Sequence, residues 1–473
     1  MGNRFQDAPL LAASLVVSLA LLGGGYWLVK SNGLLADRSP MVSTTPSGPP
    51  PSFSAGEQVL LVDSPDKLAA VAARRSGDGA EAIALLQKSL RNRPNDPEAL
   101  IYLNNWQTAD QPQRTIAVAV PATTLPDVAK ELLRGVAEAQ TRFNQQASGN
   151  WRLRVEIADD SNHPGTSQAV AQDLVKDPAV LGVVGHFSST TSLAAAKIYQ
   201  EAGLPMISPS STAVGLSDLG DAILRTVPSD RQAGQALAMV ARQQLKLQRV
   251  AVFFNPKSAY SQSLKTEFVQ QFSADGQGEV QLQEIGPEPI DAQRVLEQVR
   301  ANNNQGVVLF GQRPVQTGEG LVLLGDRQTL PSELAIVEAN RRRLPILSGD
   351  SLYSIDLLKL GASAQDTILA IPWHADLPQS AAFVKATRRR WGGDVSWRTA
   401  MAYDATQALI AAIAGETTRS GVRQALHRPG FQATGASAPV RFSATGDRAL
   451  PLVLITVRPG NRSGTGFDFG LLK

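Results

Sequence analysis

The sequence predicts an α/β protein whose main domain consists of two doubly wound lobes. From Thr115 onward, short β-rich runs alternate with longer amphipathic runs of helical spacing, and this series occurs twice. Strands that alternate with helices form mostly parallel sheets, which bind ligands at the carboxyl ends of their strands. A charge-free N-terminal run and a short helical segment come first. We therefore expect a transmembrane helix, a short α-helical unit and then the two lobes.

The charge-free run covers residues 8–29. A membrane-spanning helix needs about 20 apolar residues, whereas the apolar part of a cleaved signal peptide is shorter and precedes a small-residue cleavage site. No clear site of that kind follows the run. We therefore predict a short cytoplasmic stub and a retained signal anchor within 1–36. A cleaved signal peptide is the alternative. Either way, the main domain is expected on the periplasmic or extracytoplasmic side of a cell membrane.

Two segments separate the anchor from the main domain. Residues 37–56 are rich in Pro, Ser and Thr, which is typical of an extended linker. Residues 57–112 contain three stretches of helical spacing, divided at 77–79 and 94–97. Part of this pattern, within 66–107, looks like about one tetratricopeptide repeat, and such repeats need neighbours to bury their faces. The helices either pack on the main domain or dock a partner protein.

The two series of the main domain each contain about five predicted strands. In the first, we expect strands at 115–120, 153–158, 180–185, 205–208 and 223–226, with helices at 127–144, 166–176 and 192–202. In the second, we expect strands at 249–254, 280–285, 306–310, 344–347 and 367–371, with helices at 231–245 and 261–273. Each series has the content of one lobe, and ligands commonly bind between such domains.

The composition excludes several classes of function. The chain has 473 residues, no cysteine and a formal net charge of only +3. Without cysteine there are no disulfides, thiolate metal sites or cysteine nucleophiles. The four histidines lie far apart without ligand spacing, so we expect neither a metal nor a cofactor. The Arg triplets at 341–343 and 388–390 lack interleaved aromatic residues, and we expect no nucleic-acid binding.

Two strand ends carry a concentration of hydroxyl side chains. Residues 185–192 read Gly-His-Phe-Ser-Ser-Thr-Thr-Ser directly before a predicted helix, and residues 208–212 read Ser-Pro-Ser-Ser-Thr. Hydroxyls and free backbone N–H groups at a helix N-terminus suit a carboxylate, and the helix dipole attracts the anion. Ordinary N-capping of the helix explains the same residues without a ligand.

The same segments resemble a known family. Gly-His-Phe-Ser-Ser-Thr-Thr at 185–191, Ala-Lys-Ile-Tyr at 196–199 and Met-Ile-Ser-Pro-Ser-Ser-Thr-Ala at 206–213 resemble the leucine/isoleucine/valine-binding proteins. These proteins have the type I periplasmic binding fold and serve ABC importers. The resemblance implies that fold for residues 113–473. The implied lobe boundaries are about 113–228 and 374–437 for lobe I, and about 229–373 and 438–473 for lobe II.

The resemblance also implies a ligand site. Positions that hold the ligand carboxylate in the family match Ser189, Ser210 and Thr212. An acidic position that meets the ligand ammonium matches Asp350, so the two ends fit a zwitterion. Tyr260 matches an aromatic residue that faces the cleft from lobe II, the alternative being a loop residue that covers its own lobe.

The sequence departs from the family at some of these positions. Gln312 stands where a cleft tyrosine is usual, and Ser210 stands where alanine is usual. The first loop, at 122–126, lacks the usual Ser-Gly and Tyr-Gly segment. We count Gln312 among the expected ligand-binding residues. The cleft is expected to be more polar than that of a leucine binder, so the resemblance implies an amino acid more firmly than a branched-chain one.

The leading functional prediction is a tethered solute-binding protein. It captures an amino acid, or a similar small zwitterion or amide, between two lobes that close about hinges near Pro228, Trp373 and Ala438, and delivers it to an ABC permease. The alternative is an envelope scaffold or regulator that docks a partner protein through its binding fold and tetratricopeptide-like helices. We find no nucleophile elbow, phosphate loop or zinc-protease motif, and predict that the chain is not an enzyme.

Overall fold

The computed structural model describes residues 48–61, 64–146, 149–302 and 318–472. The predicted membrane helix at 8–29, the predicted strand at 306–310 and Gln312 lie outside these residues. Within the described ranges, no helix is both long and apolar enough to cross a membrane. The described residues belong to one compact unit, Ser47–Lys473.

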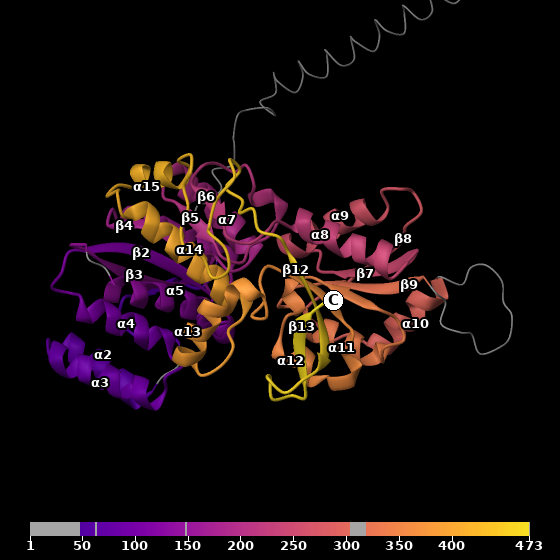
Figure 1. Cartoon of the computed structure of the whole chain (residues 1–473), viewed down its shortest axis with the longest axis horizontal. Coiled ribbons are helices and arrows are strands. Elements are labelled where there is room, and N and C mark those ends of the chain that lie inside the picture. The colour runs from indigo at the N-terminus through magenta and orange to yellow at the C-terminus, as the bar shows by residue number, and fades with distance from the viewer. Residues whose placement is uncertain (1–47, 62–63, 147–148, 303–317, 473) are drawn as a thin grey trace, which may run out of the picture. The chain divides into compact units, whose positions relative to one another are not determined.

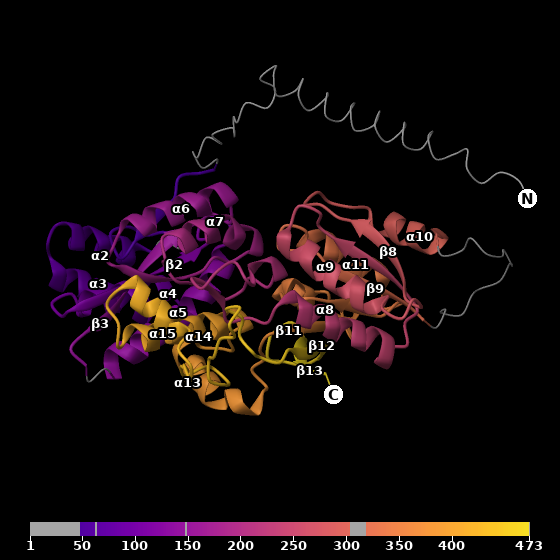
Figure 2. The ribbon, with the colours of Figure 1, turned by 90° about the horizontal axis from the view of Figure 1, so that it is seen from above.

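Lobe I contains a six-stranded sheet with helices on both faces. Its strands are β1 (Ser52–Ser54), β2 (Gln113–Val120), β3 (Arg152–Asp159), β4 (Val180–Val184), β5 (Met206–Ser208) and β6 (Ile223–Arg225). Its helices are α5 (Pro126–Gln146), α6 (Pro164–Lys176), α7 (Ser189–Glu201), α13 (Ala381–Trp391), α14 (Trp397–Ile413) and α15 (Arg419–Leu426). The strand order is β1-β3-β2-β4-β5-β6, parallel except for β1. Figure 2 shows α6 and α7 on one face of this sheet, and α5 and α14 on the other.

Lobe II contains a seven-stranded sheet. Its strands are β7 (Arg249–Phe254), β8 (Glu279–Glu284), β9 (Glu319–Leu324), β10 (Ile346–Ser348), β11 (Ile368–Ile371), β12 (Val453–Pro459) and β13 (Phe467–Leu471). Its helices are α8 (Asp230–Met239), α9 (Ala259–Phe272), α10 (Ala292–Asn302), α11 (Leu330–Asn340) and α12 (Ile355–Lys359). The order is β13-β12-β11-β10-β9-β7-β8, and only β12 and β13 run antiparallel to their neighbours.

Both faces of the central strands β7, β9, β10 and β11 of lobe II are buried, which explains their nearly continuous apolar sequences. Along β7, Val250 and Val252 pack into the cluster that includes α8 and α9, whereas Phe253 packs into the cluster that includes α10 and α11. Side chains of a strand alternate between faces, so one apolar run covers both. The strand β9 was not predicted. The sequence analysis placed a strand at 306–310 instead of at the six residues that follow Gly318.

The chain passes between the lobes three times, after β6, after β11 and before β12 (Figure 1). The first two passages lie near Pro228 and Trp373. We expected the third passage near Ala438, but it lies further along the chain. Residues up to Arg448 stay on lobe I, because Asp447 bridges to Arg225 of β6 and Arg448 forms a buried ion pair with Asp404 of α14.

The segments before the main domain are part of lobe I. Residues 52–54, which we expected in the linker, form β1 and pair with β3. The helical unit consists of α2 (Pro65–Arg75), α3 (Gly79–Asn92) and α4 (Pro97–Gln107). Helix α4 is buried along nearly its whole length, and the Asn105 amide donates to backbone oxygens of Ala55 and Val155. The helices therefore pack on the main domain, which is the first of the two alternatives.

Candidate ligand-binding site

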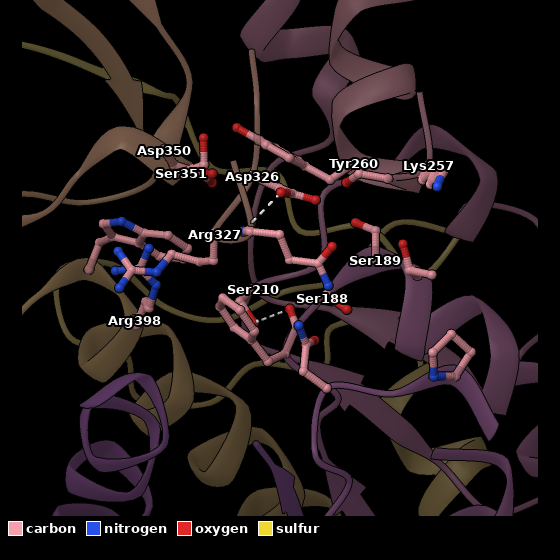
Figure 3. Close-up of a pocket in the computed structure, with 17 residues that line it drawn as sticks. Ser188, Ser189, Ser210, Lys257, Tyr260, Asp326, Arg327, Asp350, Ser351 and Arg398 are labelled. Atoms are coloured by element: carbon pink, nitrogen blue, oxygen red, sulfur yellow. Dashed lines mark hydrogen bonds between the residues drawn. The ribbon is translucent and has the colours of Figure 1, made fainter. Parts of the chain in front are cut away.

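A cavity of about 190 Å³ lies between the two lobes. It is lined by residues that follow β4 and β5 in lobe I and residues that follow β7, β9 and β10 in lobe II, so it lies at the carboxyl ends of both parallel sheets. One water molecule needs only about 10–15 Å³ by a comparable measure. The space therefore suits a small organic molecule. Figure 3 shows the side chains around it.

The lobe I wall is the hydroxyl-rich turn that begins α7. Ser188 caps this helix, its Oγ accepting from the backbone N–H of Thr191 at 3.2 Å. Ser189 Oγ accepts from Ala213 N at 3.1 Å, and the Ser210 hydroxyl donates to the carbonyl of Phe187 at 2.8 Å. These bonds tie the ends of β4 and β5 together. They leave the N-terminus of α7, with its partly unpaired N–H groups, beside the cavity.

A buried polar network fixes this turn from behind. The His186 ring is fully buried, with Nδ1 at 2.6 Å from the Asp160 carboxylate and Nε2 at 3.1 Å from the Tyr199 hydroxyl. The His186 carbonyl accepts from the Ser208 hydroxyl at 2.9 Å. Because each buried polar group has a partner, the turn is held in one conformation.

The lobe II wall brings Tyr260 of α9 beside Asp350, which follows β10. Burial raises the pKa of Asp350 to about 6, while the charge of Arg398 and the Tyr260 hydroxyl act in the opposite direction. The loop before Asp350 approaches the ring closely, because a Cβ atom added to Gly349 would lie 2.2 Å from the Tyr260 hydroxyl oxygen. Tyr260 is thus a cavity residue rather than a cover for its own lobe.

Asp230, which the sequence did not indicate, lies behind this wall at the start of α8. Its side chain is 1% exposed, and burial raises its pKa to about 7. The Asp350 charge raises it further, whereas the Thr212 and Ser263 hydroxyls lower it. Neither carboxylate oxygen of Asp230 has a hydrogen-bond partner within the described residues.

Thr212 does not line the cavity, contrary to our expectation. Its carbonyl accepts from the backbone N–H of Asp230 at 2.8 Å, which draws the residue into the first passage between the lobes. There its hydroxyl is buried without a hydrogen-bond partner among the described residues. Of the other predicted residues, Ser189, Ser210, Tyr260 and Asp350 all line the one cavity, and Gln312 lies outside the described residues.

Three basic residues on the cavity wall were missed by the sequence analysis. They are Lys257 after β7, Arg327 after β9 and Arg398 near the start of α14. The family segments quoted from the sequence include neither α14, which carries Arg398, nor the loop after β9, which carries Arg327.

Hydrogen bonds join the lobes next to the cavity. The backbone N–H of Ala259 in α9 donates to Thr190 Oγ1 in α7 at 3.1 Å. The backbone N–H of Val214 in lobe I donates to Ser263 Oγ in α9 at 2.9 Å. The start of α7, which forms one wall, is therefore in direct contact with the helix that carries Tyr260.

Comparisons with known proteins agree with this architecture. A sequence model described as periplasmic binding protein matches residues 115–458. An amino acid binding protein of Pseudomonas aeruginosa is 29% identical over 202 residues, covering 42% of this chain and 54% of that protein. A Leu/Ile/Val-binding protein of Escherichia coli is 32% identical over 133 residues, covering 28% and 35%. This chain thus spans about half the length, or less, of these relatives.

A solved structure of a leucine binding protein from Thermotoga maritima has the same fold. The TM-score is 0.63 at 22% identity, and the match covers 75% of this chain and 97% of that one. This likeness concerns the fold alone, whereas the family match extends over more than half of the chain. The chain therefore belongs to the periplasmic binding protein family of solute-binding proteins, which are not enzymes, and has the type I fold of its branched-chain amino acid binders.

Proposed function

We propose that this chain binds an amino acid between its lobes and delivers it to an ABC importer. The observation that carries the proposal is that one cavity joins two opposite kinds of group. Lobe I contributes the N-terminus of α7 and the Ser189 hydroxyl, whose proton is still free to donate, and lobe II contributes Asp350. The α-carboxylate of an amino acid fits the first, and its ammonium fits the second.

A ligand that pairs with groups of both lobes gives a physical reason for the lobes to close around it. A zwitterion that contacts both walls has more contacts when the lobes are together, so it stabilises the closed arrangement relative to an open one. The hydrogen bonds from α9 to Thr190 and from Val214 to Ser263 add to the same arrangement. The printed names of the relatives, amino acid binding protein and Leu/Ile/Val-binding protein, support the same class of ligand.

Calorimetric titration of the purified full-length chain with the common amino acids tests the proposal. We expect at least one of them to bind. Asp350→Asn should weaken that binding by about 2–4 kcal/mol, or roughly 30-fold and more in Kd, because the buried ammonium loses its charged partner. Asp356→Asn is the matched control, since Asp356 pairs with Lys359 at the surface. Full binding by the Asp350 variant, or no binding of any amino acid, would contradict the proposal.

We also infer that the chain is exported and held at the membrane by residues 8–29. Their lack of charge over a membrane-spanning length supports this. In a Gram-negative host, the full-length chain should stay with membranes after alkaline carbonate washing and should be digested when protease is added to spheroplasts. A mature chain that begins near residue 37 and is released in soluble form would show that the segment is a cleaved signal instead.

The scaffold alternative has less support. Tetratricopeptide-like docking needs a free helix face, but α4 is buried between α3 and α5 and its side chains bond to lobe I. The Lys67 ammonium of α2 is likewise used internally, at 2.8 Å from both Asp96 and Glu98. These helices stabilise lobe I, and we do not propose them as a binding module.

A further inference from the structure

We propose that the cleft contains a second anion-binding subsite, formed by Arg327 of lobe II and Arg398 of lobe I, which selects an amino acid with an acidic side chain. This inference rests on the proposed function, because it assumes that the ligand backbone lies between Ser189 and Asp350. It adds the class of side chain, which differs from the branched apolar class in the printed name of the Leu/Ile/Val-binding relative.

The first observation is that Arg398 is buried and that one of its N–H donors has no hydrogen-bond partner among the described residues. Arg398 is only 3% exposed, and its guanidinium lies 4.5 Å from the centre of the Trp397 ring. One terminal nitrogen donates to the Glu131 carboxylate at 3.1 Å. Its Nε has no hydrogen-bond partner within the described part of the chain. A buried unpaired donor is costly, and a ligand acceptor in the cavity would satisfy it.

The second observation is that Arg327 approaches the same end of the cavity from the other lobe. Figure 3 draws the two side chains on one side of the site. The Arg327 Nε is also buried without a partner among the residues that the structure describes. Burial lowers the pKa of Arg327, and the positive charge of Arg398 lowers it further, whereas the carboxylates of Glu131, Asp356 and Asp127 raise it. Two guanidinium groups that repel each other across a cleft form a site for an anion between them.

The carboxylates of the wall do not neutralise this pair. Asp326 lines the cavity, but its oxygens accept from the Asn255 amide at 3.1 Å and from the backbone N–H of Gln328 at 3.0 Å. Lys257 adds a third, exposed cation at the rim. Asp350 is the remaining acidic group on the wall, and in the proposed function it meets the ligand ammonium.

The groups that share the cavity favour a dicarboxylic amino acid. Asp350, Arg327 and Arg398 all line this one space, so the ammonium site and the Arg pair face the same ligand. Aspartate and glutamate carry a second carboxylate within a few bonds of the ammonium. A guanidinium pairs with a carboxylate through two parallel hydrogen bonds, whereas a leucine side chain would leave both arginines unpaired.

Calorimetric titration of the full-length chain with glutamate, aspartate, glutamine, asparagine and leucine tests the subsite. Glutamine and asparagine match the acids in shape and differ in charge. We expect glutamate or aspartate to bind at least about tenfold more tightly than its own amide, as one charge-assisted pair provides. Arg327→Gln should remove this preference and leave the affinity for the amide within about threefold. Arg389→Gln, at an exposed site on α13, is the charge-matched control.

Arg327 is the better residue to test, because its loss breaks no ion pair among the described residues, whereas Arg398→Gln also removes the partner of Glu131. Equal or tighter binding of the amides or leucine would overturn the subsite and leave the amino-acid function intact. An acid preference that survives in Arg327→Gln would overturn it as well. If none of the five compounds binds, the subsite fails. The proposed function fails with it only if the other common amino acids also do not bind.

Discussion

Single carboxylates in and behind the cleft are held in an unfavourable environment. Burial raises the pKa of Asp350 to about 6 and of Asp230 to about 7, and the Asp350 charge further opposes ionisation of Asp230. A carboxylate that binds a ligand cation is destabilised in its charged form while the site is empty. The desolvation of the carboxylate is offset only when the cation binds. The raised pKa values are therefore consistent with a site built for a positively charged group.

Because the pKa of Asp230 is raised, we expect replacement of this residue by asparagine to stabilise the folded chain in a pH-dependent way. Its pKa in the folded state lies above the unfolded value, so the folded chain binds the proton more tightly, and stability falls as pH rises from about 4 to about 7. Asp230→Asn should therefore raise the free energy of unfolding at pH 8, by on the order of 1–3 kcal/mol, and change it little near pH 4.5. Urea unfolding at the two pH values measures this.

The control for this prediction is Asp275→Asn, because Asp275 is exposed and paired with Arg242. It should not stabilise the chain at pH 8. A gain for Asp230→Asn that is equal at both pH values would mean that ionisation is not its cause.

At the scale of elements, the loop after β10 and helix α9 are fitted to each other. An added Cβ at Gly349 would lie 2.2 Å from the Tyr260 hydroxyl and 2.7 Å from Leu264 Cδ2. Gly349→Ala should therefore lower the free energy of unfolding by about 1–3 kcal/mol, as overpacking does, and weaken ligand binding by moving Tyr260. Tyr260→Phe in the same chain should recover part of the stability, since it removes the nearest atom.

Gly393→Ala is the matched control, because an added Cβ there meets nothing within 4 Å. Urea unfolding of the single and double variants measures the coupling between the two positions. Additive effects of Gly349→Ala and Tyr260→Phe would show that the close approach of loop and helix does not matter.

The sequence predicts those parts of the site that depend on local features, and it fails where contacts join residues far apart in the chain. Ser189 and Ser210 were noted as hydroxyls at predicted strand ends, which parallel strands bring to one edge. Asp350 was named because it matches an acidic position of the resembled family. The Arg398 and Arg327 pair was not, because each arginine comes from a different lobe and nothing local links them. The third passage was misplaced for a similar reason, since Arg448 is held on lobe I by Asp404, far away in the chain.

At the scale of the whole molecule, the account requires that one ligand touches both lobes. Lobe I supplies the N-terminus of α7, lobe II supplies Asp350, and the arginine pair is divided between the lobes in the same way. Because three passages of chain connect the lobes, their relative position is free to respond to such a ligand. A site confined to one lobe would have no such effect.

Hydrogen exchange of the full-length chain, measured by mass spectrometry with and without saturating glutamate, tests this requirement most directly. Binding that spans the cleft should slow backbone exchange in both walls, at residues 187–192 of lobe I and at residues 350–354 of lobe II. The end of α13 at 388–392, which does not line the cavity, should exchange at its original rate. Slower exchange in one wall alone, or in neither, would contradict the account.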